Sequence, residues 1–282
     1  MGYEALPQWL WLTTLFLFGL IFGSFGNVVI WRLPRGESLS SPPSHCPKCN
    51  KPIRPYDNIP VVSWLLLGGK CRDCEAPISP RYPGVELLSG ILWLAAGIRF
   101  GESFAALAAV VLFYLLTLLA FIDWDTMRLP NSLVGMMAGF GLLGALVSQF
   151  GQVAITPLLV SAASGPLAQP IWSALAGAVA AAGIVLVIGG IYSAVRGGQG
   201  YGAGDVKLLA AMGFFLGLYS LMALFIGTLI GAVYGVVSAR RSREGGRHKF
   251  AFGPFLAIGG VITVLVGPWI WAWYAGIARI GM

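Results

Sequence analysis

The chain has 282 residues, of which 57% are hydrophobic and only 10% are charged, and its mean hydropathy is +0.80. No soluble core of this length requires such a composition, which excludes a soluble globular protein and indicates a membrane protein with several spans. The formal net charge of +7 fits basic loops that set topology and meet anionic lipid, so we do not expect nucleic-acid binding.

The apolar stretches predict an all-α polytopic membrane protein with about eight transmembrane helices, because each approaches or reaches the roughly 20 residues that cross a bilayer. We expect these helices near 9–30, 84–99, 104–122, 133–150, 171–193, 206–219, 221–239 and 254–275. The second and sixth are short for a full crossing, so the expected count holds to within about one span.

The lysines and arginines predict the orientation of the spans. Eight of the 18 lie between the first two spans, and five more lie between positions 240 and 249. Loops rich in these residues stay on the cytoplasmic side, and an even number of spans places both loops there. Asp123, which follows the span 104–122, and Asp205, which precedes the span 206–219, are then expected at the cytoplasmic face.

Residues 31–83 are rich in proline, cysteine and charge, and they predict a small cytoplasmic module between the first two helices. All four cysteines of the chain lie there, in two Cys-x-x-Cys pairs: Cys46, Cys49, Cys71 and Cys74. Two such pairs can give four thiolates to one tetrahedral zinc ion. Disulfides or free thiols are the alternatives, and a reducing cytoplasm disfavours disulfides. Four sulfur ligands leave no position for a catalytic water, so the predicted zinc is structural.

Asp123 and Asp205 are the candidate catalytic residues, because ionisable groups at membrane helix ends are costly and often functional. Two neighbouring carboxyl groups can hydrolyse a peptide without a metal. The ionised group takes a proton from water, and the protonated group donates to the scissile carbonyl. The alternative is that both aspartates cap helix ends and that Asp125 is a solvated loop residue. Spacing alone does not separate these interpretations.

Several stretches resemble one family, the bifunctional type IV prepilin peptidases, which are leader peptidase/N-methyltransferases. The similar stretches are 23–34, the two cysteine pairs, 77–88, 123–130, the Gly-x-Gly-Asp motif in 202–208, and 252–255. They follow the order of the family and cover nearly the whole chain. Gly26, where many members have leucine, and Ala203, in a variable position, are small departures.

The resemblance implies a GxGD-type intramembrane aspartyl protease of the bacterial inner membrane, with its site at the cytoplasmic face. It implies cleavage of the basic leader of prepilins and pseudopilins after a glycine, and N-methylation of the new terminal residue from S-adenosylmethionine. Asp205 matches the GxGD aspartate. Asp123 matches its partner better than Asp125, because shorter relatives keep an aspartate seven residues before the proline.

We therefore expect a first transmembrane helix in 1–30, the four-cysteine zinc module in 31–83 and the peptidase core in 84–282. Asn27 is a candidate for lining a substrate or methyl-donor site, although its segment has small residues that also suit helix packing. Glu86 is a candidate for binding the positive N-terminus of the mature pilin or for methyl transfer, or else a helix-dipole carboxylate. No nucleotide-binding loop is found, so the sequence predicts no residues for the methyl donor.

Two other classes of function remain as alternatives. A non-enzymatic membrane assembly factor would dock its partners through the zinc module and would tolerate asparagine at either aspartate. A proton-relaying transporter would need polar residues in several spans, and this sequence offers few beyond Asn27, serines and threonines. The sequence predicts neither the pilins that are processed nor the oligomeric state.

Overall fold

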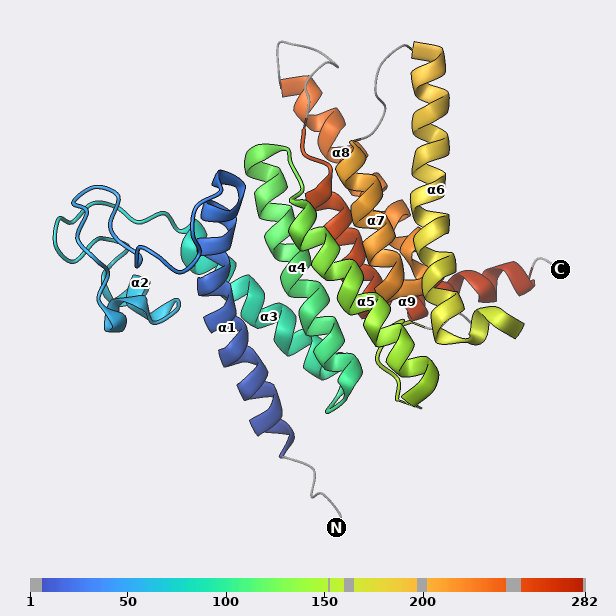
Figure 1. Cartoon of the computed structure of the whole chain (residues 1–282), viewed down its shortest axis with the longest axis horizontal. Helices are drawn as coiled ribbons and strands as arrows, with labels where there is room; N and C mark the ends of the chain where they lie inside the picture. Colours follow the sequence, from blue (N-terminus) through green and yellow to red (C-terminus); the bar gives the residue numbers. More distant parts are fainter. Residues whose placement is uncertain (1–6, 152, 160–164, 197–201, 242–249, 281–282) are drawn as a thin grey trace. The chain divides into compact units, whose positions relative to one another are not determined.

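The computed structural model describes residues 7–151, 153–159, 165–196, 202–241 and 250–280. In these residues the chain is helical, with two isolated β-bridges and no strand, which confirms the predicted all-α fold (Figure 1). The long helices are α1 (Gln8–Arg32), α3 (Arg81–Phe100), α4 (Phe104–Thr126), α5 (Asn131–Gly151), α6 (Pro170–Arg196), α7 (Ala203–Leu216), α8 (Ser220–Arg241) and α9 (Gly253–Ile280). The short ones are η1 (Leu33–Arg35), η2 (Pro55–Asn58), α2 (Val62–Leu66), η3 (Gly165–Ala168) and η4 (Gly217–Tyr219).

The chain divides into two compact units, Met1–Glu102 and Ser103–Met282. The first unit contains α1, the cysteine-rich segment with α2, and α3. The second contains α4 to α9. The finer division expected from the sequence, at 30/31 and 83/84, stays a prediction.

Seven helices in the described part of the chain are long and apolar enough to cross a membrane, where the sequence predicted about eight spans. The difference lies in one stretch, because the expected spans 206–219 and 221–239 form a single run of 38 residues, Ala203–Arg240. This run is about twice the length that one crossing needs. Gly217, with a φ of 57°, interrupts it and separates α7 from α8. By hydropathy alone the run is continuous. The backbone turn at Gly217 divides it into two helices close to the boundary that the sequence predicted between 219 and 221.

Small residues bring α1 and α3 together in the first unit. A Cβ added to Gly19 would lie 2.7 Å from the Cα of Gly90, and one added to Gly23 would lie 2.7 Å from the Cα of Glu86. Glycines at such positions let two membrane helices approach to backbone contact. Gly23 therefore has the packing role that was one of the two interpretations of segment 23–34.

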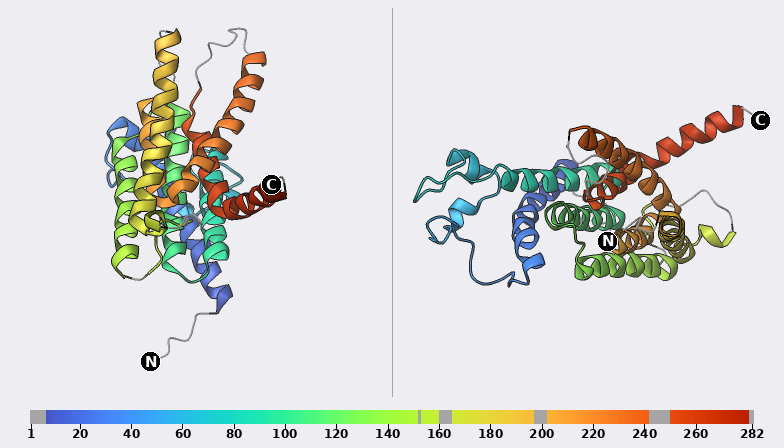
Figure 2. Two further views of the ribbon diagram at one scale, coloured as in Figure 1. Left: turned by 90° about the vertical axis from the view of Figure 1, so that its right-hand side faces the viewer. Right: turned by 90° about the horizontal axis from the view of Figure 1, so that it is seen from above.

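The second unit is built around α4, which is the most buried of the candidate spans. In its apolar stretch 67% of the residues are buried, against 28% in that of α6. The helices α6 and α7 touch through their backbones, since a Cβ on Gly177 would lie 2.1 Å from the carbonyl oxygen of Gly217. A Cβ on Gly213 would lie 2.3 Å from the backbone nitrogen of Ala178. Helix α9 contains Pro268 and bends along its length (Figure 2), as an internal proline requires.

The contact between α6 and α7 predicts that Gly177→Ala destabilises the protein, because the added methyl has no space. Overpacking of this kind costs about 1–3 kcal/mol, or roughly 3–10 °C in Tm. Gly183→Ala on the same helix is the control, since a Cβ there meets nothing within 4 Å. Thermal unfolding of the purified protein in detergent measures both changes, and equal Tm values for the two variants would contradict the packing described.

Candidate active site and metal site

Asp123 lies in the last turn of α4 and is only 5% exposed. Its Oδ2 accepts a hydrogen bond of 2.9 Å from the backbone N–H of Gly253, the first residue of α9. The first N–H groups of a helix have no partner within the helix and favour a negatively charged group. The start of α9 therefore supplies the donor that a buried carboxylate needs.

Gly253 makes this hydrogen bond possible because it has no side chain. A Cβ at this position would lie 2.7 Å from Oδ2 and 3.2 Å from Cγ of Asp123. Any other residue would displace the carboxyl group or push α9 away from it. Sequence reasoning used segment 252–255 only as part of a resemblance and missed this role, since a glycine beside a proline at a helix start signals a turn rather than a partner for a carboxylate.

Asp205 lies in the first turn of α7 and is half-buried. Its carboxyl group interacts electrostatically with that of Asp123 and with the backbone N–H of the N-cap residue, Gly202. The second contact is a helix-capping arrangement, so the capping interpretation describes part of what Asp205 does. The first interaction means that the two aspartates singled out by the sequence lie close enough to influence each other's charge.

The two glycines before Asp205 are explained by lack of space. A Cβ on Gly202 would lie 3.1 Å from Oδ2 of Asp205, and one on Gly204 would lie 3.2 Å from the side chain of Leu129. Neither glycine has a positive φ, so a left-handed turn conformation does not explain them. Gly204 lets α7 start close to the loop that follows α4, and Gly202 leaves room for the carboxyl group of Asp205.

Asp125 lies two residues after Asp123 and is exposed, because two residues of helix turn the side chain by roughly 200°. The electrostatic interaction of Asp205 is with Asp123. Lys207, in the first half of α7, donates a hydrogen bond of 3.0 Å to Oδ1 of Asn131. This bond joins the starts of α7 and α5.

An aromatic cluster that the sequence did not predict surrounds the end of α4. The ring of Tyr234 on α8 lies 5.8 Å from those of Trp124 and Phe250 and 5.1 Å from that of Phe255. Aromatic pairs at these distances stabilise helix contacts beyond simple burial. The cluster ties α8 to the residues that flank Asp123 and Gly253.

The four predicted cysteines form one cluster in the first unit, with their sulfur atoms all within 4.8 Å of one another. The sulfurs of Cys46 and Cys74 are 3.8 Å apart. A tetrahedral zinc ion with Zn–S bonds of about 2.3 Å sets its sulfurs about 3.8 Å apart, so the donor set fits zinc. All four are free thiols, and His45 is outside the cluster with its Nδ1 3.2 Å from the carbonyl of Pro43.

Both cysteine pairs have the same backbone form. In the first, Cys46 N–H donates to Lys51 O at 3.0 Å and Asn50 N–H donates to Cys46 O at 2.8 Å. The second repeats this pattern with two bonds of 2.9 Å: Cys71 N–H to Ala76 O, and Glu75 N–H to Cys71 O. The residue after the second cysteine of each pair has a positive φ, which is 61° at Asn50 and 56° at Glu75.

The charge state of the cluster also fits a cation. Backbone N–H groups of Cys49 and Lys48 lower the pKa of Cys46 to about 6. The backbone near Ala76 lowers the pKa of Cys74, but burial and the other three thiols outweigh it and raise that pKa to about 12. Four adjacent sulfurs cannot all be negative unless a cation neutralises them, and a divalent metal does so.

Residues 17–100 match the bacterial peptidase A24 N-terminal domain, and residues 110–236 match the type IV leader peptidase family. The chain is 37% identical over 296 residues to a prepilin leader peptidase/N-methyltransferase of Aeromonas hydrophila, with 96% of both chains covered. The chain belongs to the type IV leader peptidase family. Proteins of the same name from Neisseria gonorrhoeae (37% identity, 90% of both chains) and Bacillus subtilis (36%, 95% of this chain and 99% of the relative) are also similar. No solved structure matches significantly.

The type IV leader peptidase family is a family of aspartic peptidases, and the long apolar helices make this member a multi-pass membrane protein. The two family matches fall one in each structural unit. The cysteine cluster lies within the first match, and Asp123 and Asp205 lie within the second.

The cysteine geometry predicts that the purified protein carries one zinc ion per chain and that Cys74→Ser loses most of it. The loss of one thiolate leaves zinc with three of its four sulfur ligands and opens the tetrahedral site, so the affinity for zinc falls. His45→Ala is the control and keeps its zinc, because this ring lies outside the sulfur cluster. Elemental analysis by mass spectrometry measures the zinc content, and a full zinc load in Cys74→Ser would show that the metal lies elsewhere.

Proposed function

We propose that this protein is a prepilin leader peptidase whose catalytic pair is Asp123 and Asp205, and that it N-methylates the N-terminus it creates. The observation that supports this most is the meeting of two aspartates from α4 and α7 in a chain with few charged residues. Their carboxyl groups interact, and Gly253 orients one of them. The relatives that cover most of the chain carry both activities in their names.

The pair can hydrolyse a peptide bond when one carboxyl group is ionised and the other carries a proton. The ionised group takes a proton from water as the water oxygen bonds to the carbonyl carbon of the scissile glycine. The neutral group gives its proton to the carbonyl oxygen. When this tetrahedral species collapses, the C–N bond breaks and the new amine of the mature pilin takes a proton from the pair.

The position of the pair fits a prepilin substrate. A prepilin has a basic leader, which stays in the cytoplasm, joined to an apolar segment that lies in the membrane. Its cleavage site is therefore at the inner surface of the bilayer. Asp123 ends one apolar helix and Asp205 begins another, where such helices leave the bilayer. We propose that this end faces the cytoplasm at the inner membrane and that the substrates are prepilins and pseudopilins.

The cysteine cluster is proposed as a structural zinc site in a module of residues 31–83, distinct from the peptidase core in 84–282. The four sulfurs fill the coordination shell of zinc, so the metal stabilises a segment that has a small core of its own. The methyl donor would be S-adenosylmethionine, which supplies a methyl group on a positively charged sulfur. The non-enzymatic assembly factor is not favoured, because nothing in its action requires a buried aspartate and a half-buried one to interact.

The proposed pair predicts that Asp123→Asn and Asp205→Asn each abolish cleavage of a purified prepilin in detergent, with a loss of at least about 10³-fold. Loss of general acid–base catalysis alone costs 10²–10⁴-fold. Asp125→Asn is the matched control and cleaves normally. A gel shift of the prepilin measures cleavage, and Tm measures folding. If Asp125→Asn is inactive while Asp123→Asn cleaves, the pair is assigned wrongly.

The contact of Gly253 predicts that Gly253→Ala lowers cleavage by at least about tenfold, because misplacement of a catalytic group by a fraction of an ångström is costly. Gly276→Ala on the same helix is the control, since a Cβ there meets nothing within 4 Å. The same prepilin assay measures kcat for both variants. Full activity in Gly253→Ala at unchanged Tm would mean that the hydrogen bond to Asp123 does not orient it for catalysis.

A further inference from the structure

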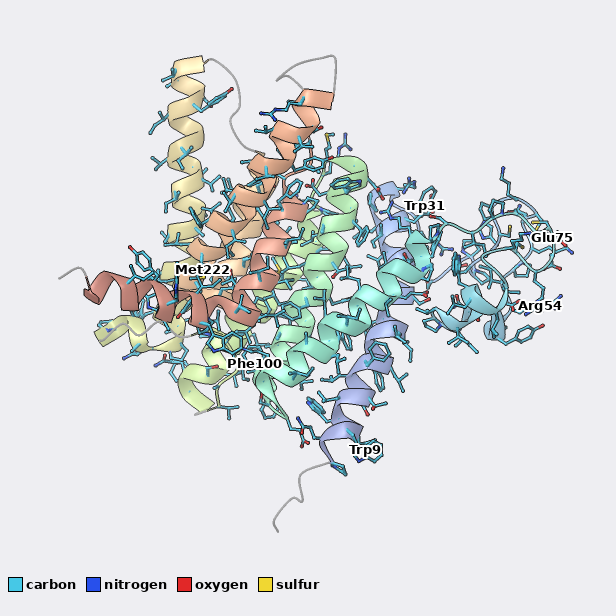
Figure 3. All side chains as sticks on the ribbon, turned by 180° about the vertical axis from the view of Figure 1, so that it is seen from behind. Trp9, Trp31, Arg54, Glu75, Phe100 and Met222 are labelled. Carbon is cyan, nitrogen blue, oxygen red and sulfur yellow. The ribbon has the colours of Figure 1, made fainter. Side chains whose placement is uncertain are left out.

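The first unit contains a cavity of about 840 Å³, a volume in the range of cofactor sites. Its walls come from the second half of α1, from the cysteine-rich segment and from the start of α3. In Figure 3, Trp31 marks this part of α1, and Arg54 and Glu75 mark the cysteine-rich segment beside it. Both cysteine pairs contribute to the wall, through Cys46 and Cys71. Three separate stretches of sequence therefore build this space.

Glu86 is the buried carboxylate in this wall. The wall also contains a buried cation, Arg32, whose guanidinium donates to the backbone carbonyls of Ser38 and Pro42. Its residue is 8% exposed, and its Oε2 accepts a hydrogen bond of 2.7 Å from the backbone N–H of Val61. The ion pairs among the described residues join Asp73 to Lys51 and Arg54, and Asp57 to Arg72. None includes Glu86. A buried carboxylate without a cation is costly, and a cation bound in the cavity would offset that cost.

The position of Glu86 is fixed by its neighbours on both sides. Gly23 of α1 packs against its Cα, as described above, and the side chain of the next residue, Ser24, interacts with its carboxyl group. On the other side Val61 has a φ of 62°, which is rare for a β-branched residue, and its N–H points at the carboxylate. The carboxyl group is thus held at the cavity wall by α1 and by the loop before α2.

The aromatic and amide side chains of the wall suit a planar, partly polar ligand. Trp64 lines the cavity with its ring held by a hydrogen bond of 3.0 Å from Nε1 to the carbonyl of Ile78. Tyr82 and Asn27 also line it, and the Asn27 side chain donates to the carbonyl of Tyr82 at 3.1 Å. Aromatic faces bind purine rings, and amide and hydroxyl groups fix their orientation.

We propose that this cavity binds S-adenosylmethionine, with Glu86 facing the sulfonium charge. The inference rests on the proposed N-methyltransferase function and gives that function a site. The acceptor amine is the other cation in the reaction, but it must be neutral to attack, whereas the sulfonium is always charged. In the transfer, the amine nitrogen bonds to the methyl carbon, the carbon–sulfur bond breaks with its electron pair going to sulfur, and the nitrogen releases a proton to water.

This assignment predicts how the site tells donor from product. S-adenosylhomocysteine keeps the adenosine and the amino-acid part but has a neutral sulfur. A carboxylate beside the sulfur therefore favours the donor, and its removal should affect the donor alone. Glu86→Gln is the variant to use, because the amide oxygen can still accept from Val61 and the shape is kept.

The experiment is isothermal titration of the purified full-length protein with S-adenosylmethionine and, separately, with S-adenosylhomocysteine. We expect Glu86→Gln to raise the Kd of the donor at least about tenfold, the size of one charge-assisted contact, and that of the product less than about threefold. Glu102→Gln, an exposed acid outside the cavity wall, is the control and leaves both values unchanged. Zinc content and Tm show that each variant is folded.

Unchanged binding of the donor in Glu86→Gln and in the cavity-filling variant Ser24→Trp would overturn the inference and leave the methyltransferase function standing. Equal weakening of donor and product by Glu86→Gln would overturn the pairing of Glu86 with the sulfonium. If the wild type cleaves a prepilin but binds neither ligand and leaves the product unmethylated by mass spectrometry, the proposed methyltransferase function itself fails.

Discussion

One backbone hydrogen bond, from the N–H of Gly253 to Asp123, is the constraint on which the candidate active site depends. Asp123 is almost fully buried at the end of the most buried helix of the second unit, and such a group must be given a partner. The partner is the first amide of α9, and no side chain fits between them. The end of α4 and the start of α9 therefore have to meet, and the aromatic cluster around Tyr234 holds them there.

The same principle of backbone contact places the second aspartate. Helix α7 lies against α6 where Gly213 meets Ala178, and it begins beside Leu129 because Gly204 leaves room. Asp205 then lies close enough to Asp123 for their carboxyl groups to interact electrostatically. In an apolar environment, where water does not drive helices together, such small-residue contacts determine which helices are neighbours. The proposed catalytic geometry and the packing of the membrane helices therefore both depend on glycines.

The sequence predicted the helices, the cysteine cluster and the two aspartates, because long apolar runs, paired cysteines and rare charges each leave a local signal. The roles of Gly253 and Val61 leave none: each depends on a carboxylate distant in sequence that folding brings to its N–H. The motif alone did not say why Gly202 and Gly204 are glycines; the structure shows that steric space rather than φ explains them. The cavity beside Glu86 needed three stretches to be placed together, which no single pattern describes.

The matching backbone turns of the two cysteine pairs have a thermodynamic consequence. Each turn closes through its own local hydrogen bonds, and these bonds orient both cysteines of a pair toward one point. A zinc ion bound by the four sulfurs would link two halves that are separated by 21 residues between Cys49 and Cys71. Its effect would be that of a cross-link, which reduces the entropy of the unfolded loop much as a disulfide does. Unlike a disulfide, such a link needs no oxidant and can exchange with free zinc.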